Sequence, residues 1–214
     1  MTLKLTAATL LIVLGTAAAQ TLPELRTDPT TGGSIFYVKN VAPKPVTAFL
    51  IELVNYPGSS YSLYQDEAAI DLIAPGAEKR IPVTNMTVGA VPDYVKLTAA
   101  LFADGTSAGI PEKITQLVER RKSTLATVRE LISRLDKAKA AATPKGAVIS
   151  DLKQWAEGLQ PAGKARVSQA TINQAAARSV VSEAATWLET HSLEESLAKS
   201  HAAERSLAAS KPAL

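Results

Sequence analysis

The character of the sequence changes sharply near residue 105, and this change limits what the chain can fold into. All tyrosine and phenylalanine residues and most prolines precede that point. The chain after it is rich in alanine, lysine, arginine, glutamate and leucine. Aromatic and β-branched residues between turns favour strands, whereas the second composition favours helices. We therefore predict an α+β protein in which the strands come first.

Short β-compatible segments alternate with turn residues before residue 105. In the clearest of them, 94–102, the apolar residues Val95, Leu97, Ala99 and Leu101 should share one face. Pro82 predicts that the segment around it is an edge strand. A spacing of roughly 8–12 residues between turn signals predicts a small antiparallel sandwich. The six expected strands are Ser34–Val41, Val46–Val54, Tyr61–Tyr64, Ala69–Ile73, Glu78–Val83 and Tyr94–Phe102.

Several short motifs in this half resemble immunoglobulin-like domains of exported bacterial proteins. The motifs are Val38-Lys39-Asn40, Pro45-Val46-Thr47-Ala48-Phe49, Ala74-Pro75-Gly76, and Leu101-Phe102-Ala103-Asp104-Gly105-Thr106 ahead of a basic helix. The resemblance covers about residues 34–108 and implies an immunoglobulin-like β-sandwich that serves as a binding or spacer module. Because the motifs consist of turn and core residues, the resemblance implies no catalytic residues.

A long helix should open at Pro111, since proline suits the first helical turn, and stop at Thr143-Pro144-Lys145-Gly146. Its apolar positions advance by alternate steps of four and three, and Arg121 alone interrupts the stripe. This heptad spacing predicts packing against another helix at a shallow angle. The stripe consists of Ile114, Val118, Arg121, Leu125, Val128, Ile132 and Leu135.

Two further helical segments follow. We expect one over Ile149–Gly158, with Ser150 as its N-cap, and one over residues 164–207 that is interrupted near residues 190–192. The stretch 112–139 has eight basic and four acidic residues, a net charge of +4, whereas 178–205 has three basic and five acidic residues, a net charge of −2. The opposite charges favour a helical hairpin or small bundle within one chain. A homodimeric coiled coil is the alternative.

The N-terminus has the pattern of a secretory signal peptide. Lys4 precedes an apolar run from Leu5 to Leu14, and Ala17 and Ala19 are placed for cleavage before Gln20. We predict residues 1–19 as the signal peptide and residues 20–33 as a flexible leader. The chain has no cysteine, so disulfides and thiolate chemistry are excluded. We expect an exported protein, periplasmic or secreted, with no membrane span in the mature chain.

Motifs that carry chemistry are sparse. His191 and His201 lie ten residues apart without metal-ligand spacing, and no GxSxG or phosphate-loop motif occurs. The run Glu119-Arg120-Arg121-Lys122 has interleaved acids and no neighbouring aromatics, so a solvated helix face is favoured over nucleic-acid binding. We predict no catalytic, cofactor-binding or metal-binding residues. The acids weighed for hydrolysis or calcium binding are Asp66, Glu67, Asp71, Asp93 and Asp104.

These observations predict four segments: the signal peptide 1–19, the leader 20–33, a β-sandwich domain 34–108 and a helical region 109–210. The function they favour is that of an exported, non-enzymatic interaction or scaffold protein. Its protein partner is left open, and no nucleic acid is expected. One alternative is a periplasmic structural or spacer protein that self-associates through its helices. Another is an atypical hydrolase that uses carboxylates.

Overall fold

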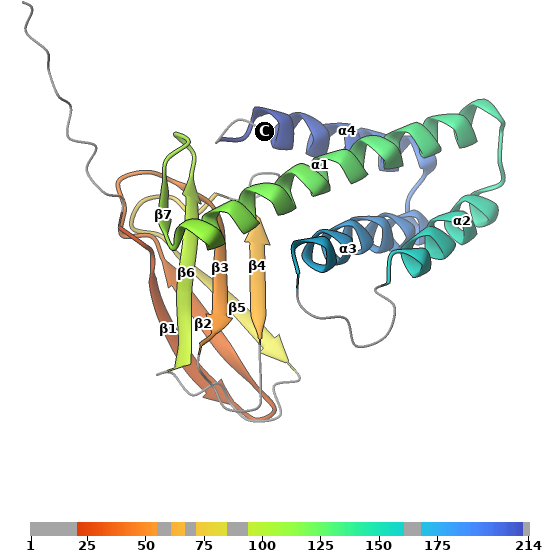
Figure 1. Ribbon diagram of the computed structural model, residues 1–214. Coiled ribbons are helices and arrows are strands. Elements are labelled where there is room, and N and C mark those ends of the chain that lie inside the picture. The colour runs from red at the N-terminus through yellow and green to blue at the C-terminus, as the bar shows by residue number, and fades with distance from the viewer. Residues whose placement is uncertain (1–20, 55–60, 67–71, 85–93, 161–167, 212–214) are drawn as a thin grey trace, which may run out of the picture.

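The computed structural model describes residues 21–54, 61–66, 72–84, 94–160 and 168–211. Two antiparallel sheets, of three and four strands, are followed by four helices, as expected of an α+β chain (Figure 1). The signal peptide predicted at residues 1–19 lies outside the described residues. None of the described helices is long and apolar enough to cross a membrane.

The first sheet has the strand order β1-β2-β5 and consists of β1 (Glu24–Thr30), β2 (Gly33–Lys39) and β5 (Glu78–Thr84). β2 and β5 correspond to the strands predicted at 34–41 and 78–83. Pro82 lies on an edge strand, as predicted, where a residue without an N–H is tolerated.

The prediction of a flexible leader at residues 20–33 is wrong, because β1 occupies most of that range. β1 forms an antiparallel hairpin with β2, in which Leu25 pairs with Val38. Gly32 turns the hairpin at a φ of 78°, a left-handed value that glycine adopts without strain. The sequence of β1 is mostly polar and contains Pro29, so it lacks the alternation that identifies a strand. Pairing with the apolar β2 orders it instead.

The second sheet has the order β4-β3-β6-β7. Its strands are β3 (Val46–Leu53), β4 (Ser62–Asp66), β6 (Val95–Phe102) and β7 (Ser107–Gly109). The first three correspond to predicted strands. Three of the five residues of the strand predicted at 69–73 lie outside the described residues. Its last residue, Ile73, forms a single bridge with Val46.

The pairing of β3 with β6 is interrupted twice by an extra residue. Thr47 is the extra residue on β3, and Thr98 is the extra residue on β6. Such bulges redirect the side chains around them. The register on either side pairs Val46 with Phe102, Ala48 with Leu101, Leu50 with Ala99, and Ile51 with Leu97.

The bulge at Thr98 makes the prediction of a single apolar face on β6 wrong. Val95 and Leu97 pack with a cluster of buried side chains that draws on both sheets, among them Phe36 of the first sheet. Ala99 and Leu101 belong instead to a second cluster, on the face of the sheet that α1 covers. One strand therefore contributes to two cores.

Four helices make up the second half: α1 (Pro111–Ala140), α2 (Lys145–Gly158), α3 (Gln169–Thr190) and α4 (Leu193–Ala209). The break between α3 and α4 lies where it was predicted. α2 begins at Lys145, four residues before its predicted start, because Pro144 has the fixed φ that suits the residue before a helix. Ser150 therefore lies inside α2, and its predicted role as N-cap is wrong.

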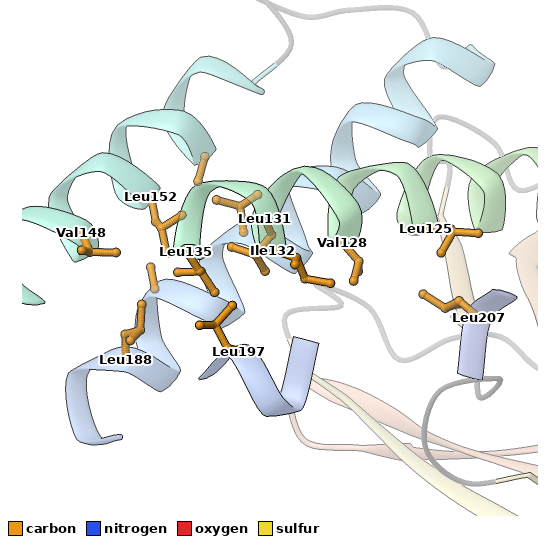
Figure 2. Close-up of a cluster of buried hydrophobic side chains, with 13 residues drawn as sticks. Leu125, Val128, Leu131, Ile132, Leu135, Val148, Leu152, Leu188, Leu197 and Leu207 are labelled. Atoms are coloured by element: carbon orange, nitrogen blue, oxygen red, sulfur yellow. The ribbon is translucent and has the colours of Figure 1, made fainter. Parts of the chain in front are cut away.

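Helix α1 is shared by the two halves of the molecule (Figure 1). Leu117, in its first third, packs against Leu50 and Leu101 of the second sheet. The later part of its apolar stripe, from Leu125 to Leu135, forms the helical core with α2, α3 and α4, as Figure 2 shows. The predicted intrachain helical packing is thus observed. The stripe proposed for a homodimeric coiled coil is buried inside the chain.

Candidate functional site

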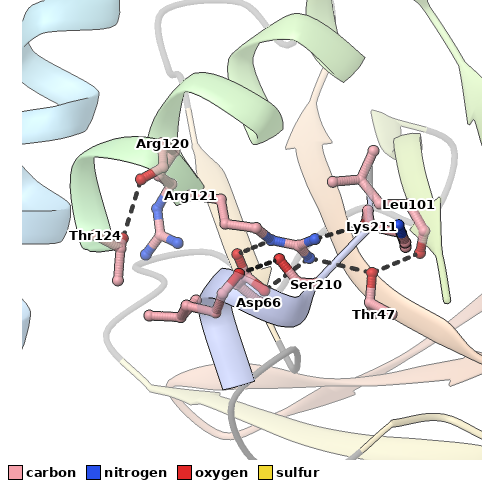
Figure 3. Close-up of polar contacts among 9 residues, drawn as sticks. Thr47, Asp66, Leu101, Arg120, Arg121, Thr124, Ser210 and Lys211 are labelled. Atoms are coloured by element: carbon pink, nitrogen blue, oxygen red, sulfur yellow. Dashed lines mark hydrogen bonds and ion pairs between the residues drawn. The ribbon is translucent and has the colours of Figure 1, made fainter. Parts of the chain in front are cut away.

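Arg121 occupies the one polar position of the α1 stripe, and the exposed fraction of its surface is 0 %. Its Nε and Nη2 donate to the two carboxylate oxygens of Asp66 on β4, both at 2.8 Å. This is the bidentate geometry in which arginine binds a carboxylate most strongly. The interruption seen in the sequence is therefore a buried ion pair between α1 and the second sheet (Figure 3).

The same guanidinium has two further partners. Its Nη2 donates to Thr47 Oγ1 at 3.1 Å, and its Nη1 donates to the backbone carbonyl of Lys211 at 2.8 Å. Thr47 in turn donates to the carbonyl of Leu101 at 3.2 Å. The bulge in β3 thus places a hydroxyl where Arg121 needs an acceptor. One side chain joins α1, two strands and the segment after α4.

A second polar link fixes the start of α1. Lys113 Nζ lies 2.6 Å from Glu52 Oε1 on β3. Thr98, the extra residue on β6, donates to the other oxygen of Glu52 at 2.8 Å. Both bulges therefore carry a threonine that takes part in a link to α1, and the helix is held over the sheet at two points.

A groove of about 480 Å³ opens beside the Arg121 ion pair. Its floor is α1, its walls are α3 and α4, and β4 borders one end. This volume lies within the range of pockets that bind small molecules. The lining residues are Tyr64, Gln65, Asp66, Arg120, Thr124, Val128, Leu131, Ala176, Ser179, Val180, Glu183, Ala184, Trp187, Ser196, Lys199, Ser200, Ala202, Ala203 and Leu207.

Arg120 lines this groove, half-buried, and its guanidinium has no hydrogen-bond acceptor or ion-pair partner among the described residues. Its carbon Cζ lies 5.6 Å from the centre of the Tyr64 ring. Burial lowers the pKa of Arg120, against the opposing effect of the charge on Asp66. In Figure 3 its side chain points away from that of Arg121, on the side of Thr124. The groove therefore contains a partly desolvated cation without a polar partner.

Trp187 contributes a second unpaired donor. Its indole nitrogen Nε1 is buried, and it has no hydrogen-bond acceptor within the described part of the chain. The indole is stacked on the ring of His191, with ring centres 3.5 Å apart. Nζ of Lys199, on α4, lies 4.1 Å from the centre of the indole ring. Lys199 also pairs with Glu183 of α3 at 2.8 Å. This pair spans the two walls of the groove.

Three hydroxyls of the groove donate to carbonyls within their own helices. Ser196 donates to the carbonyl of Ser192 at 3.0 Å, and Ser200 donates to that of Ser196 at 2.8 Å. Thr124 donates to the carbonyl of Arg120 at 3.0 Å. None of these hydroxyls donates to a histidine or carboxylate, so they lack the contact that activates a nucleophile.

The residues weighed from the sequence are not brought together. His191 contacts the carbonyl of Trp187 at 3.0 Å, and His201 lies 3.8 Å from Glu204. Asp104 accepts two hydrogen bonds from Thr106 in the turn after β6. Glu67, Asp71 and Asp93 lie outside the described residues. Across the described ranges, no group of three or more histidine, aspartate or glutamate side chains is arranged to hold a metal ion.

The basic run was predicted to be a solvated helix face, and this is wrong for its two arginines. Glu119 and Lys122 pair with each other at 2.9 Å on the outside of α1. Arg121 is fully buried and Arg120 half-buried in the groove. The signal that could have revealed this was the position of Arg121 within an otherwise apolar stripe.

Comparisons of the chain with protein-family models, with curated proteins and with solved structures found no match.

Proposed function

We propose that this chain is an exported, non-enzymatic binding protein whose ligand site is the groove between α1, α3, α4 and β4. The observation that carries the proposal is the cation of Arg120, which is half-buried in a largely apolar cavity without a polar partner. An unpaired, desolvated charge costs stability unless a ligand completes it.

The surroundings support a preformed site. Arg121 fixes α1 against β4 immediately beside Arg120, and the Glu183–Lys199 pair joins the walls. Rigid placement of the polar group lowers the entropy lost when a ligand binds. An immunoglobulin-like sandwich at 34–108 would serve as the scaffold that presents the helices, and the signal peptide would send the protein to the periplasm or outside the cell.

Two other functions receive less support. Self-association through the helices, as in a spacer protein, would need the α1 stripe, but Leu125, Val128 and Leu135 are buried within the chain. A carboxylate-based hydrolase would need two convergent acids. Asp66 is committed to Arg121, and Asp104 to its turn.

The existence of the site can be tested with a neutral dye, so that the result does not depend on ligand charge. The chain from Gln20 onward should bind Nile red with saturable enhancement of its fluorescence. Ala184→Leu fills the groove from α3 and should abolish that enhancement. Ala175→Leu, an exposed position on the same helix, is the matched control and should leave it unchanged. Equal binding by all three chains, or no binding by any, would exclude the groove as the site.

Export can be tested separately. The full chain, expressed in a bacterium, should be recovered from the periplasm or the medium, and its N-terminus should be Gln20. A chain that stays in the cytoplasm with residues 1–19 attached would contradict this part of the proposal.

A further inference from the structure

We infer that the groove binds a monoanionic amphiphile, with its acid group against Arg120 and its apolar chain along the α1 floor. The inference rests on the proposed function and names the ligand class for that same site. It follows from three properties of the groove: its charge, its unpaired donors and its apolar lining.

The charge of the groove is not balanced. Asp66 gives both carboxylate oxygens to Arg121, and Glu183 pairs with Lys199. Arg120 is the lining cation that these two pairs leave without a partner. A single unbalanced cation in a desolvated site favours a ligand that carries one negative charge. A cationic head group would be repelled there.

The cation of the groove is a hydrogen-bond donor. The guanidinium of Arg120 offers several N–H groups, and they find no acceptor among the described residues. Ser196 and Ser200 donate elsewhere and so add no competing donor. A carboxylate supplies acceptors only, which matches this set, whereas an alcohol supplies fewer acceptors and no charge.

The rest of the lining is apolar. Val128 and Leu131 of α1 and Leu207 of α4 are buried along the groove, and Val180 and Ala184 of α3 face them. About 480 Å³ suits a small ligand. The acid end therefore belongs beside β4, where Arg120 lies against Tyr64, and the chain belongs between α3 and α4.

The test uses Trp187 as the reporter. Trp155, the other tryptophan, lies under Arg134 and outside the groove. The variant Trp155→Phe therefore has Trp187 as its single tryptophan, and all tryptophan fluorescence comes from the groove. In that background, decanoate, decanol and decyltrimethylammonium are titrated below their micellisation concentrations. We expect saturable change with decanoate, at least about tenfold weaker binding of decanol, and no saturable binding of the cation.

Arg120→Met keeps an apolar stem and removes the charge. It should weaken decanoate binding at least about tenfold and leave decanol binding unchanged. Arg129→Met, an exposed arginine of α1 that pairs with Glu204, is the matched control and should leave both unchanged. The urea midpoint of Arg120→Met should be equal to or above that of the parent, which shows that it folds.

The outcomes separate the two proposals. If Nile red binds in the groove but decanoate binds no better than decanol, the ligand class is wrong and the binding site stands. If decanoate binding survives Arg120→Met, the assignment of the acid group is wrong. If neither dye nor amphiphile binds, both proposals fail.

Discussion

Two adjacent arginines have opposite roles because of their places on one helix. Arg120 and Arg121 are separated by about 100° around α1, since an α-helix has about 3.6 residues per turn. That rotation places Arg121 against the sheet, where Asp66, Thr47 and Lys211 complete its hydrogen bonds. It places Arg120 in the groove, where no described side chain accepts a hydrogen bond from its guanidinium. Arg121 should therefore determine stability, and Arg120 binding.

Replacing Arg121 tests the first role. Arg121→Met leaves the carboxylate of Asp66 without its ion-pair partner, and it should lower the free energy of unfolding by about 3–5 kcal/mol. Urea denaturation measures the change, with Arg129→Met as an exposed control that should cost less than about 1 kcal/mol.

The same site allows a second check. Adding Asp66→Leu to Arg121→Met removes the carboxylate that has lost Arg121, so the double variant should recover most of the lost stability. If Arg121→Met alone costs less than the exposed control, the ion pair does not stabilise the fold.

At the scale of elements, short connections decide where strands give way to helices. Gly109, the last residue of β7, has a φ of 113° two residues before α1 begins. A Cβ added there would lie 2.2 Å from the carbonyl oxygen of Thr98. Conformation and close approach together require glycine at this position.

Gly109→Ala should therefore lower the free energy of unfolding by at least about 2 kcal/mol. Gly146→Ala is the control, because its Cβ would meet nothing within 4 Å in the first turn of α2. It should raise stability by up to about 1 kcal/mol through helix propensity. Urea midpoints of the two variants should move in opposite directions, and a shift of both in one direction would contradict the argument.

Helix α4 begins with a capping box. The N–H of Ser192 donates to Glu195 Oε2 at 2.7 Å, and Ser192 Oγ accepts from the N–H of Glu195 at 3.1 Å. The hydrogen bond from the Ser192 N–H, and after it the Ser192 side chain, lower the pKa of Glu195 below its ordinary value. The ionised carboxylate is thus favoured in the folded state.

This cap should make stability depend on pH. Because the folded pKa is lowered, the contribution of Glu195 is complete above the ordinary value of about 4.3 and is lost as the pH falls through the folded value. Glu195→Gln should unfold at lower urea than the parent at neutral pH, and the difference should shrink in acid. Glu194→Gln removes the same charge from the same turn without touching the cap. An equal pH dependence in both variants would refute the effect.

At the scale of the whole molecule, α1 makes the two halves one unit. Its first third is part of the core on the second sheet, and the remainder is part of the helical core. Lys211, beyond α4, is bound back to Arg121. Without this helix, the outer face of the second sheet at Leu50 and Leu101 and the helical core would both be uncovered.

We therefore expect one cooperative unfolding transition. Every tyrosine precedes residue 105, and both tryptophans lie in helices, so near-ultraviolet circular dichroism separates the halves. Tyrosine and tryptophan signals should change at the same urea concentration. Leu117→Ala, at the contact between α1 and the sheet, should lower the free energy of unfolding by about 2–5 kcal/mol. Both urea midpoints should therefore fall together. Two separate midpoints would show that the halves unfold independently.

The sequence by itself determined the order of elements: strands first, then helices from Pro111 onward, and the break near Thr190. The short strand β7, after residue 105, was not predicted. Alternation and helical periodicity are local properties, so they can be read without the fold. The leader was mispredicted because β1 has no such pattern and depends on its partner strand. Periodicity also identified the buried stripe of α1, including Arg121.

Only the tertiary structure decided what those buried positions meet. Asp66 and Arg121 are 55 residues apart, and their pairing depends on β4 lying at the edge of the sheet that α1 crosses. The bulges at Thr47 and Thr98 arise from strand register, which the sequence does not specify. The same holds for the groove, because the unpaired state of Arg120 depends on the side chains that three helices and a strand bring around it.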